Sequence, residues 1–421
     1  MNVGFLLHLY QPPTQTENVF KQICSDSYFP LIKLIKNKPN YKFTLNVPLS
    51  LLEQMDKYGY KEWLKDLRDL YESERIEIVG CVAYHSLLTK TPELLAEQGI
   101  ILNEFGLGYY LGSRQGFEGE ESILVKNLRG FFPPELCVND SVIKLVSSLG
   151  YDWLLADKCV VPQEQILMLG QNVFKYKNET ALVVIRDGEI SNMLSFKRDS
   201  FGDEILEKIN KRSETTDSIV IALDAEAFGH HNKEGMYLLE DICDKLIRSG
   251  NNLTTVSDLV AESPMEHADA VFESNWSEAS CTTDPSKLYK LWANKDNEIQ
   301  KSLWYIQENI LKSYEKVANF TSPEGFENVA VWNPVEMQKL SVEDRSKVEL
   351  MLLVNKSLHS DQFWWASNEQ IYDKVLFSPT MINRALDYYK EISARLNDAE
   401  LIYLVAKKSE EISAIISQQI K

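Results

Sequence analysis

Ile219-Val-Ile-Ala-Leu-Asp224 is a run of five apolar residues that ends in a carboxylate. A short continuous apolar run predicts a strand that is buried on both faces, as in parallel sheets covered by helices. Amphipathic stretches such as 51–71 and 142–149 separate further runs of this kind. These other runs are 3–8, 43–47, 76–81, 130–132, 151–156, 181–185 and 253–256. Seven or eight strand–helix units over about 250 residues favour a β/α barrel over an open doubly wound sheet.

The pattern changes from about residue 284, where helical periodicity replaces the strand signals. Helices are expected over 288–314, 342–355, 380–395 and 400–419, and no strand is expected there. We therefore predict a barrel domain in residues 1–270, followed by a C-terminal α-helical domain in residues 271–421.

The charge balance of the chain excludes some classes of partner. The 421 residues include 44 basic and 62 acidic side chains, which gives a net charge of −18. A nucleic-acid partner is not expected, because phosphates are bound by clustered Lys and Arg. A membrane partner is not expected either, because no stretch approaches the roughly 18 consecutive apolar residues of a spanning helix.

Cysteine usage and the N-terminus predict a cytoplasmic protein. The six cysteines are scattered without a C-x-x-C pair, which favours free thiols in a reducing compartment. The apolar N-terminal stretch is brief and lacks a basic region, so it reads as a buried strand and not as a signal peptide.

Polar residues follow several of the expected strands. In a β/α barrel the catalytic groups lie at the C-terminal ends of the strands. The first expected strand ends in His8, the fourth leads to Glu135, and the seventh leads to Asp224. Two carboxylates on different strands, among histidines and aromatic residues, are what glycoside hydrolysis requires. Acidic residues also cap helices after strands, so this pattern alone leaves both readings open.

Six motifs, in this order along the chain, resemble the signature regions of glycoside hydrolase family 57, and the stretch Arg186-Asp-Gly-Glu-Ile-Ser191 resembles a recurrent stretch of that family. The motifs are His8-Leu-Tyr-Gln-Pro-Pro13, Gly80-Cys-Val-Ala-Tyr-His85, Gly130-Phe-Phe-Pro-Pro-Glu135, Leu223-Asp-Ala-Glu-Ala-Phe-Gly-His-His231, Asn275-Trp-Ser277 and Ser360-Asp-Gln-Phe-Trp-Trp365. Each motif is moderately specific, and their order along nearly the whole chain makes the resemblance strong.

The resemblance implies an incomplete (β/α)7 barrel, with a C-terminal helical region that completes the cleft. It also implies a retaining, cofactor-free glycosidase or transferase, acting on an α-1,4-linked glucan or maltooligosaccharide. In that family the nucleophile and the acid/base fall at the positions of Glu135 and Asp224. Known activities of the family are α-amylase, amylopullulanase, 4-α-glucanotransferase, branching enzyme and α-galactosidase. Water as acceptor makes a hydrolase and a sugar hydroxyl makes a transferase, and both stay open.

Further residues of the motifs are expected to bind the sugar chain. Each also has a structural reading: a histidine can be a barrel-core residue, Asp361 can cap a helix, and the tryptophans can be core residues. Of the adjacent pair His230 and His231 we expect one to face the cleft, because neighbouring helical positions diverge by about 100°. The expected binding residues are His8, Gln11, His85, Glu226, His230, His231, Trp276, Asp361 and Trp364.

Two alternatives belong to other functional classes. A catalytically silent glucan-binding member would lack the nucleophile or the acid, and both are present. A metal-dependent polysaccharide deacetylase would need two histidines at i and i+4 of a helix together with an Asp. The chain has no His-x-x-x-His sequence, so a metal site is not expected.

Overall fold

The computed structural model describes residues 1–112, 128–161, 172–196, 202–277, 282, 284–318, 333–371 and 374–419. The chain divides into two compact units, each described separately below. The first comprises Met1–Gln11, Gln15–Val82 and Gly106–Ser277, and the second comprises Pro12–Thr14, Ala83–Phe105 and Glu278–Lys421. The predicted division into folding domains at residue 270 stays a prediction.

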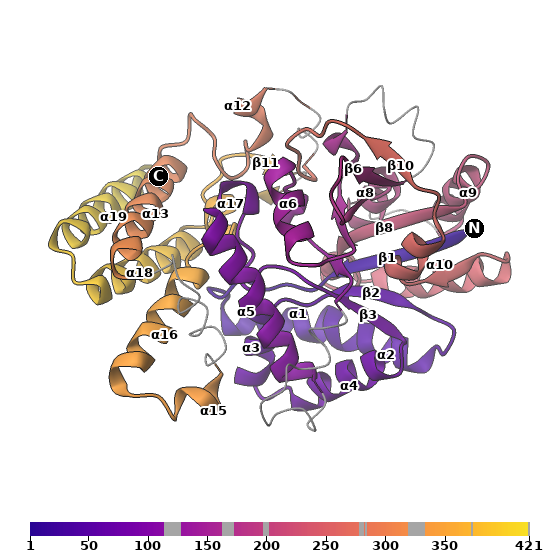
Figure 1. Cartoon of the computed structure of the whole chain (residues 1–421), viewed down its shortest axis with the longest axis horizontal. Coiled ribbons are helices and arrows are strands. Elements are labelled where there is room, and N and C mark those ends of the chain that lie inside the picture. The colour runs from indigo at the N-terminus through magenta and orange to yellow at the C-terminus, as the bar shows by residue number, and fades with distance from the viewer. Residues whose placement is uncertain are drawn as a thin grey trace. The chain divides into compact units, whose positions relative to one another are not determined.

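β1 (Asn2–His8) lies at the centre of the first sheet of the first unit. β8 (Ser218–Asp224) pairs with it over its whole length, while β9 (Asn252–Thr254) and β2 (Phe43–Asn46) pair with its first and last residues. β3 (Ile76–Val79) follows β2, and every one of these pairings is parallel. Figure 1 shows β1, β2 and β8 side by side.

The second sheet of this unit has the order β10-β6-β7-β5-β4. Its strands are β4 (Gly130–Phe131), β5 (Trp153–Ala156), β6 (Val173–Tyr176), β7 (Leu182–Ile185) and β10 (Glu266–Ala268). The pairing of β6 with β7 is antiparallel and the others are parallel. β6 and β10 were not among the expected strands.

Two seams join these sheets into a ring. At the first, the Gly80 amide donates to the Gly130 carbonyl (2.8 Å) and the Phe132 amide donates to the Gly80 carbonyl (2.9 Å). At the second, the Asp187 amide donates to the Val220 carbonyl (2.7 Å). The ring order is therefore β1-β2-β3-β4-β5-β7-β8. Because both seams have fewer hydrogen bonds than a full ladder, the prediction of an incomplete (β/α)7 barrel is confirmed.

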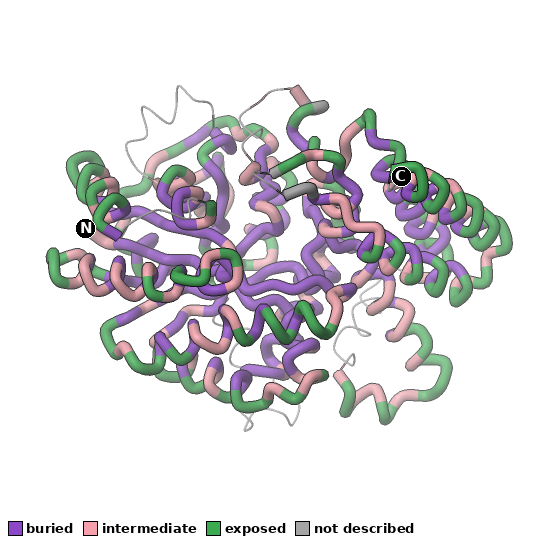
Figure 2. Tube along the Cα trace, turned by 180° about the vertical axis from the view of Figure 1, so that it is seen from behind, coloured by how far each residue is buried: buried purple, intermediate pink, exposed green. Residues whose placement is uncertain are grey.

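Amphipathic helices enclose the barrel strands. In Figure 2 the strands of this unit are buried, whereas its helices alternate between buried and exposed residues. α4, for example, buries Trp63, Leu64, Leu67 and Leu70, which share one helical face. The helices of this unit are α1 (Glu17–Ile23), α2 (Phe29–Asn37), α3 (Leu49–Lys57), α4 (Lys61–Glu72), α6 (Asp140–Ser148), α8 (Gly188–Phe196), α9 (Gly202–Arg212), α10 (Gly235–Arg248) and α11 (Val256–Glu262).

The expected helical stretch 51–71 is two helices and not one. α3 ends at Lys57 and α4 begins at Lys61. Between them Gly59 has φ +78°, a left-handed conformation that ends α-helices and that glycine adopts without steric cost.

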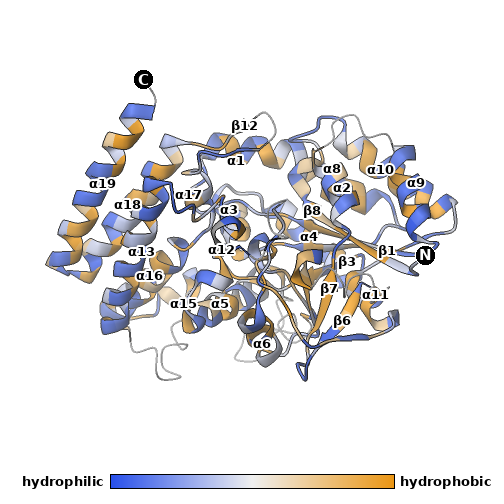
Figure 3. Ribbon diagram, turned by 90° about the horizontal axis from the view of Figure 1, so that it is seen from above, coloured by the Kyte–Doolittle hydropathy of each residue, from blue (hydrophilic) through white to orange (hydrophobic). Residues whose placement is uncertain are grey.

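The second unit is mainly helical. α13 (Glu298–Val317), α18 (Pro379–Leu396) and α19 (Ala399–Gln419) pack against one another and α16 (Val342–Lys356) packs on α18. Apolar residues line the buried side of each long helix, which Figure 3 shows as orange stripes between blue ones. Part of α5 (Glu93–Leu111) and the short helices α12 (Pro285–Leu288), α15 (Pro334–Met337) and α17 (Asp361–Trp364) also belong to this unit.

Two expectations for the C-terminal third need correction. The helix expected from residue 288 starts only at Glu298, because the Asn297 side chain accepts hydrogen bonds from the amides of Ile299 and Gln300 (both 3.0 Å) and so caps α13. The expectation that no strand follows residue 284 is wrong, because β11 (Gln370–Ile371) pairs antiparallel with β12 (Lys374–Val375).

The thiols follow the sequence prediction only in part. Cys24, Cys81, Cys137 and Cys243 are free and buried. Cys159 is disulfide-bonded, so the expectation of free thiols is wrong for this residue. The cytoplasmic location stays a prediction, with weaker support from the cysteines. Along the described part of the chain, no helix combines the length and the apolar character needed to cross a membrane.

Candidate active site

Three neighbouring strands of the barrel end in polar residues that lie at the same level. In the parallel register, His8 at the end of β1 pairs with Asn46 of β2 on one side and with Asp224 of β8 on the other. The Asn46 side-chain carbonyl accepts a 2.7 Å hydrogen bond from His8 Nδ1. The register therefore places the proposed acid/base beside a histidine whose ring orientation is fixed by a neighbouring strand.

Aromatic rings connect His8 to the loop after β4. The His8 ring stacks on Phe132, with centroids 4.5 Å apart and an interplanar angle of 12°. His8 and Phe132 also form T-shaped contacts with the Trp276 ring, with ring centroids 6.3 and 6.0 Å apart. Of these rings His8 and Phe132 are buried, and Trp276 is half-buried.

Glu135 follows Pro133-Pro134 in a conformation that L-residues rarely adopt. Its φ is +57° and that of Leu136 is +48°, so two consecutive non-glycine residues are left-handed. Such a conformation costs about 1–3 kcal/mol per residue and persists where surrounding contacts impose it, often at functional sites. Glu135, the expected nucleophile, is therefore held in place by its neighbours.

The segment that holds Glu135 is 274–276. Val138 and Ser274 exchange backbone hydrogen bonds of 3.0 and 2.9 Å, and the Trp276 amide donates to the Glu135 carbonyl at 3.1 Å. The Trp276 indole Nε1 then donates a 2.7 Å hydrogen bond to Glu135 Oε2. Both the backbone and the carboxylate of Glu135 are thus bound by Trp276.

Arg186, directly after β7, in turn holds Trp276. Its guanidinium carbon lies 5.4 Å from the centre of the indole ring, and its Nη2 donates to the Trp276 carbonyl at 3.4 Å. Arg186 is itself buried, with Nε 2.9 Å from Asp157 Oδ2 and Nη1 3.1 Å from the Ala222 carbonyl. This residue links the loops after β5 and β7 with β8 and with Trp276.

Glu226 lies two residues after Asp224 and is buried. Its Oε1 accepts a 2.8 Å hydrogen bond from the Gln11 amide and also contacts the Tyr28 hydroxyl. Burial, followed by the nearby charge of Asp224, raises the pKa of Glu226 to about 8. Gln11, also an expected site residue, bonds Tyr28 with the same amide at 3.0 Å.

His230 and His231 lie in a turn, so the helical argument for their divergence does not apply. Their ring centroids are 5.1 Å apart. His230 Nδ1 lies 3.0 Å from Asp26 Oδ2, which also accepts from Lys233 at 2.7 Å. Burial raises the pKa of Asp26, but hydrogen bonds from Lys233, Gln22 and His230 outweigh it and bring that pKa to about 2. His231 is exposed, and its amide donates to the Glu226 carbonyl at 2.9 Å.

The second unit gathers other expected residues into a separate polar cluster. His85, with φ +61°, places Nδ1 3.0 Å from Ser360 Oγ, and its carbonyl accepts from the Ser360 amide. Burial lowers the pKa of His85 to about 4. Next to them, His359 Nδ1 lies 3.6 Å from Asp361 Oδ2, and its Nε2 lies 3.5 Å from Thr14 Oγ1.

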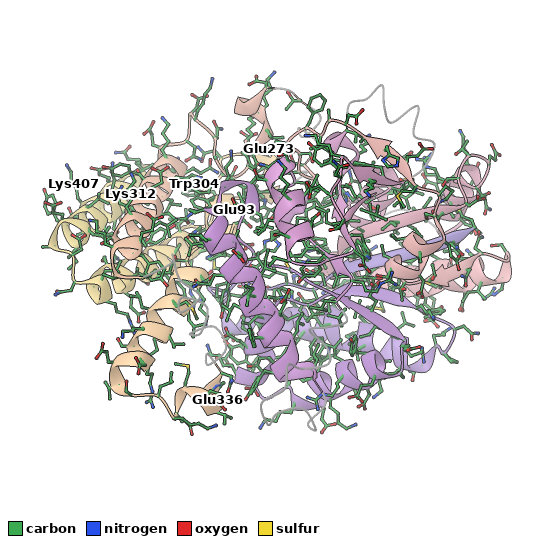
Figure 4. All side chains as sticks on the ribbon, in the orientation of Figure 1. Glu93, Glu273, Trp304, Lys312, Glu336 and Lys407 are labelled. Carbon is green, nitrogen blue, oxygen red and sulfur yellow. The ribbon has the colours of Figure 1, made fainter. Side chains whose placement is uncertain are left out.

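The tryptophans of the last motif are only half-buried. Trp364 and Trp365 are each partly exposed, whereas the preceding Phe363 is fully buried. Phe363 stacks on Trp304 of α13 at 4.0 Å with an angle of 4°; Trp304 is labelled in Figure 4. The core aromatic of this motif is therefore Phe363, and neither tryptophan is fully buried.

The expected residues thus divide between the units. The first unit brings together His8, Gln11, Glu135, Asp224, Glu226 and Trp276, with His230 and His231 on the same loop as Asp224, and the second unit holds His85, Asp361 and Trp364.

The residues of these clusters that were not predicted as site residues include Tyr28, Asn46, Asp157, Arg186 and His359. Asn46 could have been found, because it ends the second strand as His8 ends the first. Arg186 also stands at a strand end. Tyr28 lies in a helical segment that offers no such signal.

The described residues include no group of three or more His, Cys, Asp or Glu side chains arranged to hold a metal ion.

Comparison with protein families gives one match. The sequence model described as Glycosyl hydrolase family 57 matches residues 7–271 of this chain. No curated protein sequence matches it.

Several solved structures share the fold. The 4-alpha-glucanotransferase from Thermococcus litoralis is 16% identical, with a TM-score of 0.64, and the match covers 93% of this chain and 59% of that one. This chain therefore spans about three-fifths of the length of that protein. A family 57 branching enzyme from Thermococcus kodakaraensis, in complex with glucose, is 14% identical with a TM-score of 0.65. The match covers 97% of this chain and 94% of that enzyme. The alpha-amylase AmyC from Thermotoga maritima is 13% identical (TM-score 0.66, 97% and 96% covered).

Proposed function

Because this chain belongs to glycosyl hydrolase family 57, we propose that it is a retaining enzyme acting on α-1,4-linked glucans, with Glu135 as nucleophile and Asp224 as acid/base. The observation that carries the proposal is the 2.7 Å hydrogen bond from the Trp276 indole to the Glu135 carboxylate. An N–H donor stabilises the negative charge that a nucleophilic carboxylate carries before it attacks.

In the first step a Glu135 oxygen bonds to the anomeric carbon while the glycosidic bond breaks, and Asp224 gives its proton to the departing oxygen. In the second step Asp224 removes a proton from the acceptor, whose oxygen displaces Glu135 and restores the α configuration. An acceptor of water gives hydrolysis, and a sugar hydroxyl gives transfer.

Several further motif residues are proposed to bind the sugar chain. His8 ends β1 beside Asp224, and Gln11 follows in the same segment. We propose the same role for His85, Asp361 and Trp364: Asp361 and the half-buried Trp364 belong to the same helix α17, and a tryptophan and a carboxylate suit the apolar face and the hydroxyls of a sugar ring.

The experiment that tests this function analyses the products formed from purified maltoheptaose, with and without EDTA. It compares the wild type with Glu135→Gln and Asp224→Asn. Shorter products alone indicate hydrolysis, and a mixture of shorter and longer products indicates transfer. Both variants should lose at least about 1000-fold in kcat. Wild-type binding without turnover would favour a silent member, and loss of activity in EDTA would favour a metal-dependent enzyme.

The two variants should also fail differently on an aryl α-glycoside with a good leaving group. Asp224→Asn should release a burst of phenol before a slow steady state, and azide should speed turnover and give an α-glycosyl azide, because its attack needs no base. Glu135→Gln should show neither effect. If Glu135→Gln shows the burst and the azide rescue and Asp224→Asn does not, Asp224 is the nucleophile and Glu135 is the acid/base.

A further inference from the structure

One π-helical turn, Cys24–Tyr28, holds the loop that follows β8. Three consecutive residues of this turn contact it: Asp26 bonds His230, the Ser27 hydroxyl donates to the Ala225 carbonyl at 2.8 Å, and Tyr28 contacts Glu226. π-helical turns are rare and occur often at functional sites. The loop with the proposed acid/base at its start is thus fixed at three positions, one of which is the buried Glu226 side chain.

The hydrogen atoms around Tyr28 determine which protonation state of Glu226 fits. The Tyr28 hydroxyl has one hydrogen, yet two oxygens lie within reach of it: the Tyr10 carbonyl at 3.1 Å and Glu226 Oε1. If Glu226 is ionised, Tyr28 can serve only one of these acceptors. If Glu226 is protonated, its hydroxyl donates to Tyr28, and Tyr28 donates to Tyr10.

Gln11 completes this arrangement. Its amide group has two hydrogens, which are directed to the Tyr28 oxygen at 3.0 Å and to Glu226 Oε1 at 2.8 Å. A carboxylic acid hydroxyl accepts from Gln11 while it donates to Tyr28, and the Tyr28 oxygen accepts from both. Only the protonated form therefore satisfies every contact in this buried group.

The charged surroundings favour the same state. Asp224 faces Glu226 on its own loop, and Tyr28 and Cys24 face it from the π-helical turn. None of these three is a cation, and Glu226 retains only 7% of its surface exposed. In agreement, burial first and the Asp224 charge second raise the pKa of Glu226 to about 8.

We propose that Glu226 is a neutral positioning residue: as a carboxylic acid it ties the loop after β8 to Tyr28 and Gln11 without placing a negative charge beside Asp224. Its role in catalysis rests on the proposed function, since it acts through Asp224. This assignment replaces the expectation that Glu226 binds substrate directly.

Infrared spectroscopy tests the protonation state without any assay of activity. The wild type at pH 6.5 should show the carbonyl band of a protonated buried carboxyl group, and Glu226→Gln should lose one such band. Glu77→Gln is the matched control and should leave the Glu226 band in place: Glu77 is half-buried with a pKa raised by desolvation, and its carboxylate accepts hydrogen bonds from Thr44 and Ser257 instead. If Glu226→Gln does not fold, Tyr28→Phe should shift the same band, because the acid hydroxyl loses its acceptor. A Glu226 band that is absent at pH 6.5 would overturn the proposal.

The pH profile of kcat/KM tests the effect on Asp224. Glu226→Gln should lower kcat about three- to tenfold, because the hydrogen bond to Gln11 is altered. The alkaline limb of the kcat/KM profile should move by less than about 0.3 pH unit, because one neutral group replaces another. If Glu226 were ionised, its removal would favour the charged form of Asp224 and shift this limb down by about one unit or more. Such a shift would overturn the proposal. If Asp224→Asn stays active while the infrared band is present, the proposed function fails and the neutral state of Glu226 stands.

Discussion

The Trp276 indole donates a 2.7 Å hydrogen bond to Glu135, while the Trp276 amide holds the Glu135 carbonyl at 3.1 Å. This double contact explains how two consecutive left-handed residues, Glu135 and Leu136, persist in the loop after β4. A tryptophan whose polar edge is bound to the proposed nucleophile acts on the carboxylate more than on the sugar, so we expect its loss to affect the reaction and not binding.

Trp276→Phe should lower kcat about 10- to 100-fold, with KM changed less than about threefold, because a hydrogen bond to a charged group contributes about 1.5–3 kcal/mol. Steady-state kinetics on maltoheptaose measure both constants. Trp304→Phe is the matched control, since it loses an indole hydrogen bond to the Trp292 carbonyl in the second unit and should leave kcat unchanged. A rise in KM with normal kcat would mean instead that Trp276 is a sugar platform.

Arg186→Met should lower the free energy of unfolding by about 3–5 kcal/mol, because it leaves Asp157 as an unpaired buried charge. Arg129→Met provides a close comparison. Both arginines place Nε near an Asp Oδ2, at 2.9 and 2.8 Å, but the side chains of the Arg186 pair are 3% and 8% exposed, against 46% and 55% for the Arg129 pair.

Denaturant unfolding should show a change below about 1 kcal/mol for Arg129→Met. Equal losses in the two variants would contradict the role of burial in this prediction.

His85 makes stability depend on pH. Its pKa is about 4 in the folded protein and near 6.5 when unfolded, so the unfolded chain binds more protons between these values. The contribution of the neutral His85 to the free energy of unfolding is complete above pH 6.5. It is lost as the pH falls toward 4, by up to about 3 kcal/mol.

Urea unfolding at pH 7.5 and 5.0 measures this loss. His85→Asn should reduce the pH dependence, and asparagine tolerates the left-handed backbone found at this position. His267→Asn is the control, because His267 is exposed and should leave the dependence intact. If His85→Asn and the wild type lose the same stability at pH 5.0, the buried neutral histidine is not its cause.

Trp364→Ala should raise KM for maltoheptaose about tenfold and leave kcat within threefold, if the second unit binds the sugar chain. A small aryl glycoside should show a lesser effect, since it occupies fewer binding positions. An unchanged KM for maltoheptaose would assign the half-buried Trp364 a structural role alone.

Much of the barrel could be predicted because its strands are continuous apolar runs. The runs that end in His8 and Asp224 coincide with β1 and β8, and the residues that follow them lie at the strand ends as expected. The short β6 was missed, because Lys175 interrupts its run of apolar residues. In the structure β6 pairs antiparallel with β7.

The contacts within the site could not be predicted in the same way. The left-handed backbone of Glu135 results from pairing with a segment about 140 residues away along the chain, as the Trp276–Glu135 separation of 141 shows. The contact of Tyr28 with Glu226 joins positions 198 residues apart. Such relations depend on how the chain closes on itself, and no local pattern in one sequence encodes them.

The covalent intermediate tests the central claim most directly. Asp224→Asn, treated with an activated 5-fluoro-α-glucosyl fluoride and digested, should yield one modified peptide by mass spectrometry, with the added sugar on Glu135. Glu135→Gln treated in parallel should stay unmodified. A sugar attached to another residue, or no adduct in a protein that still turns over α-glucans, would contradict Glu135 as the nucleophile.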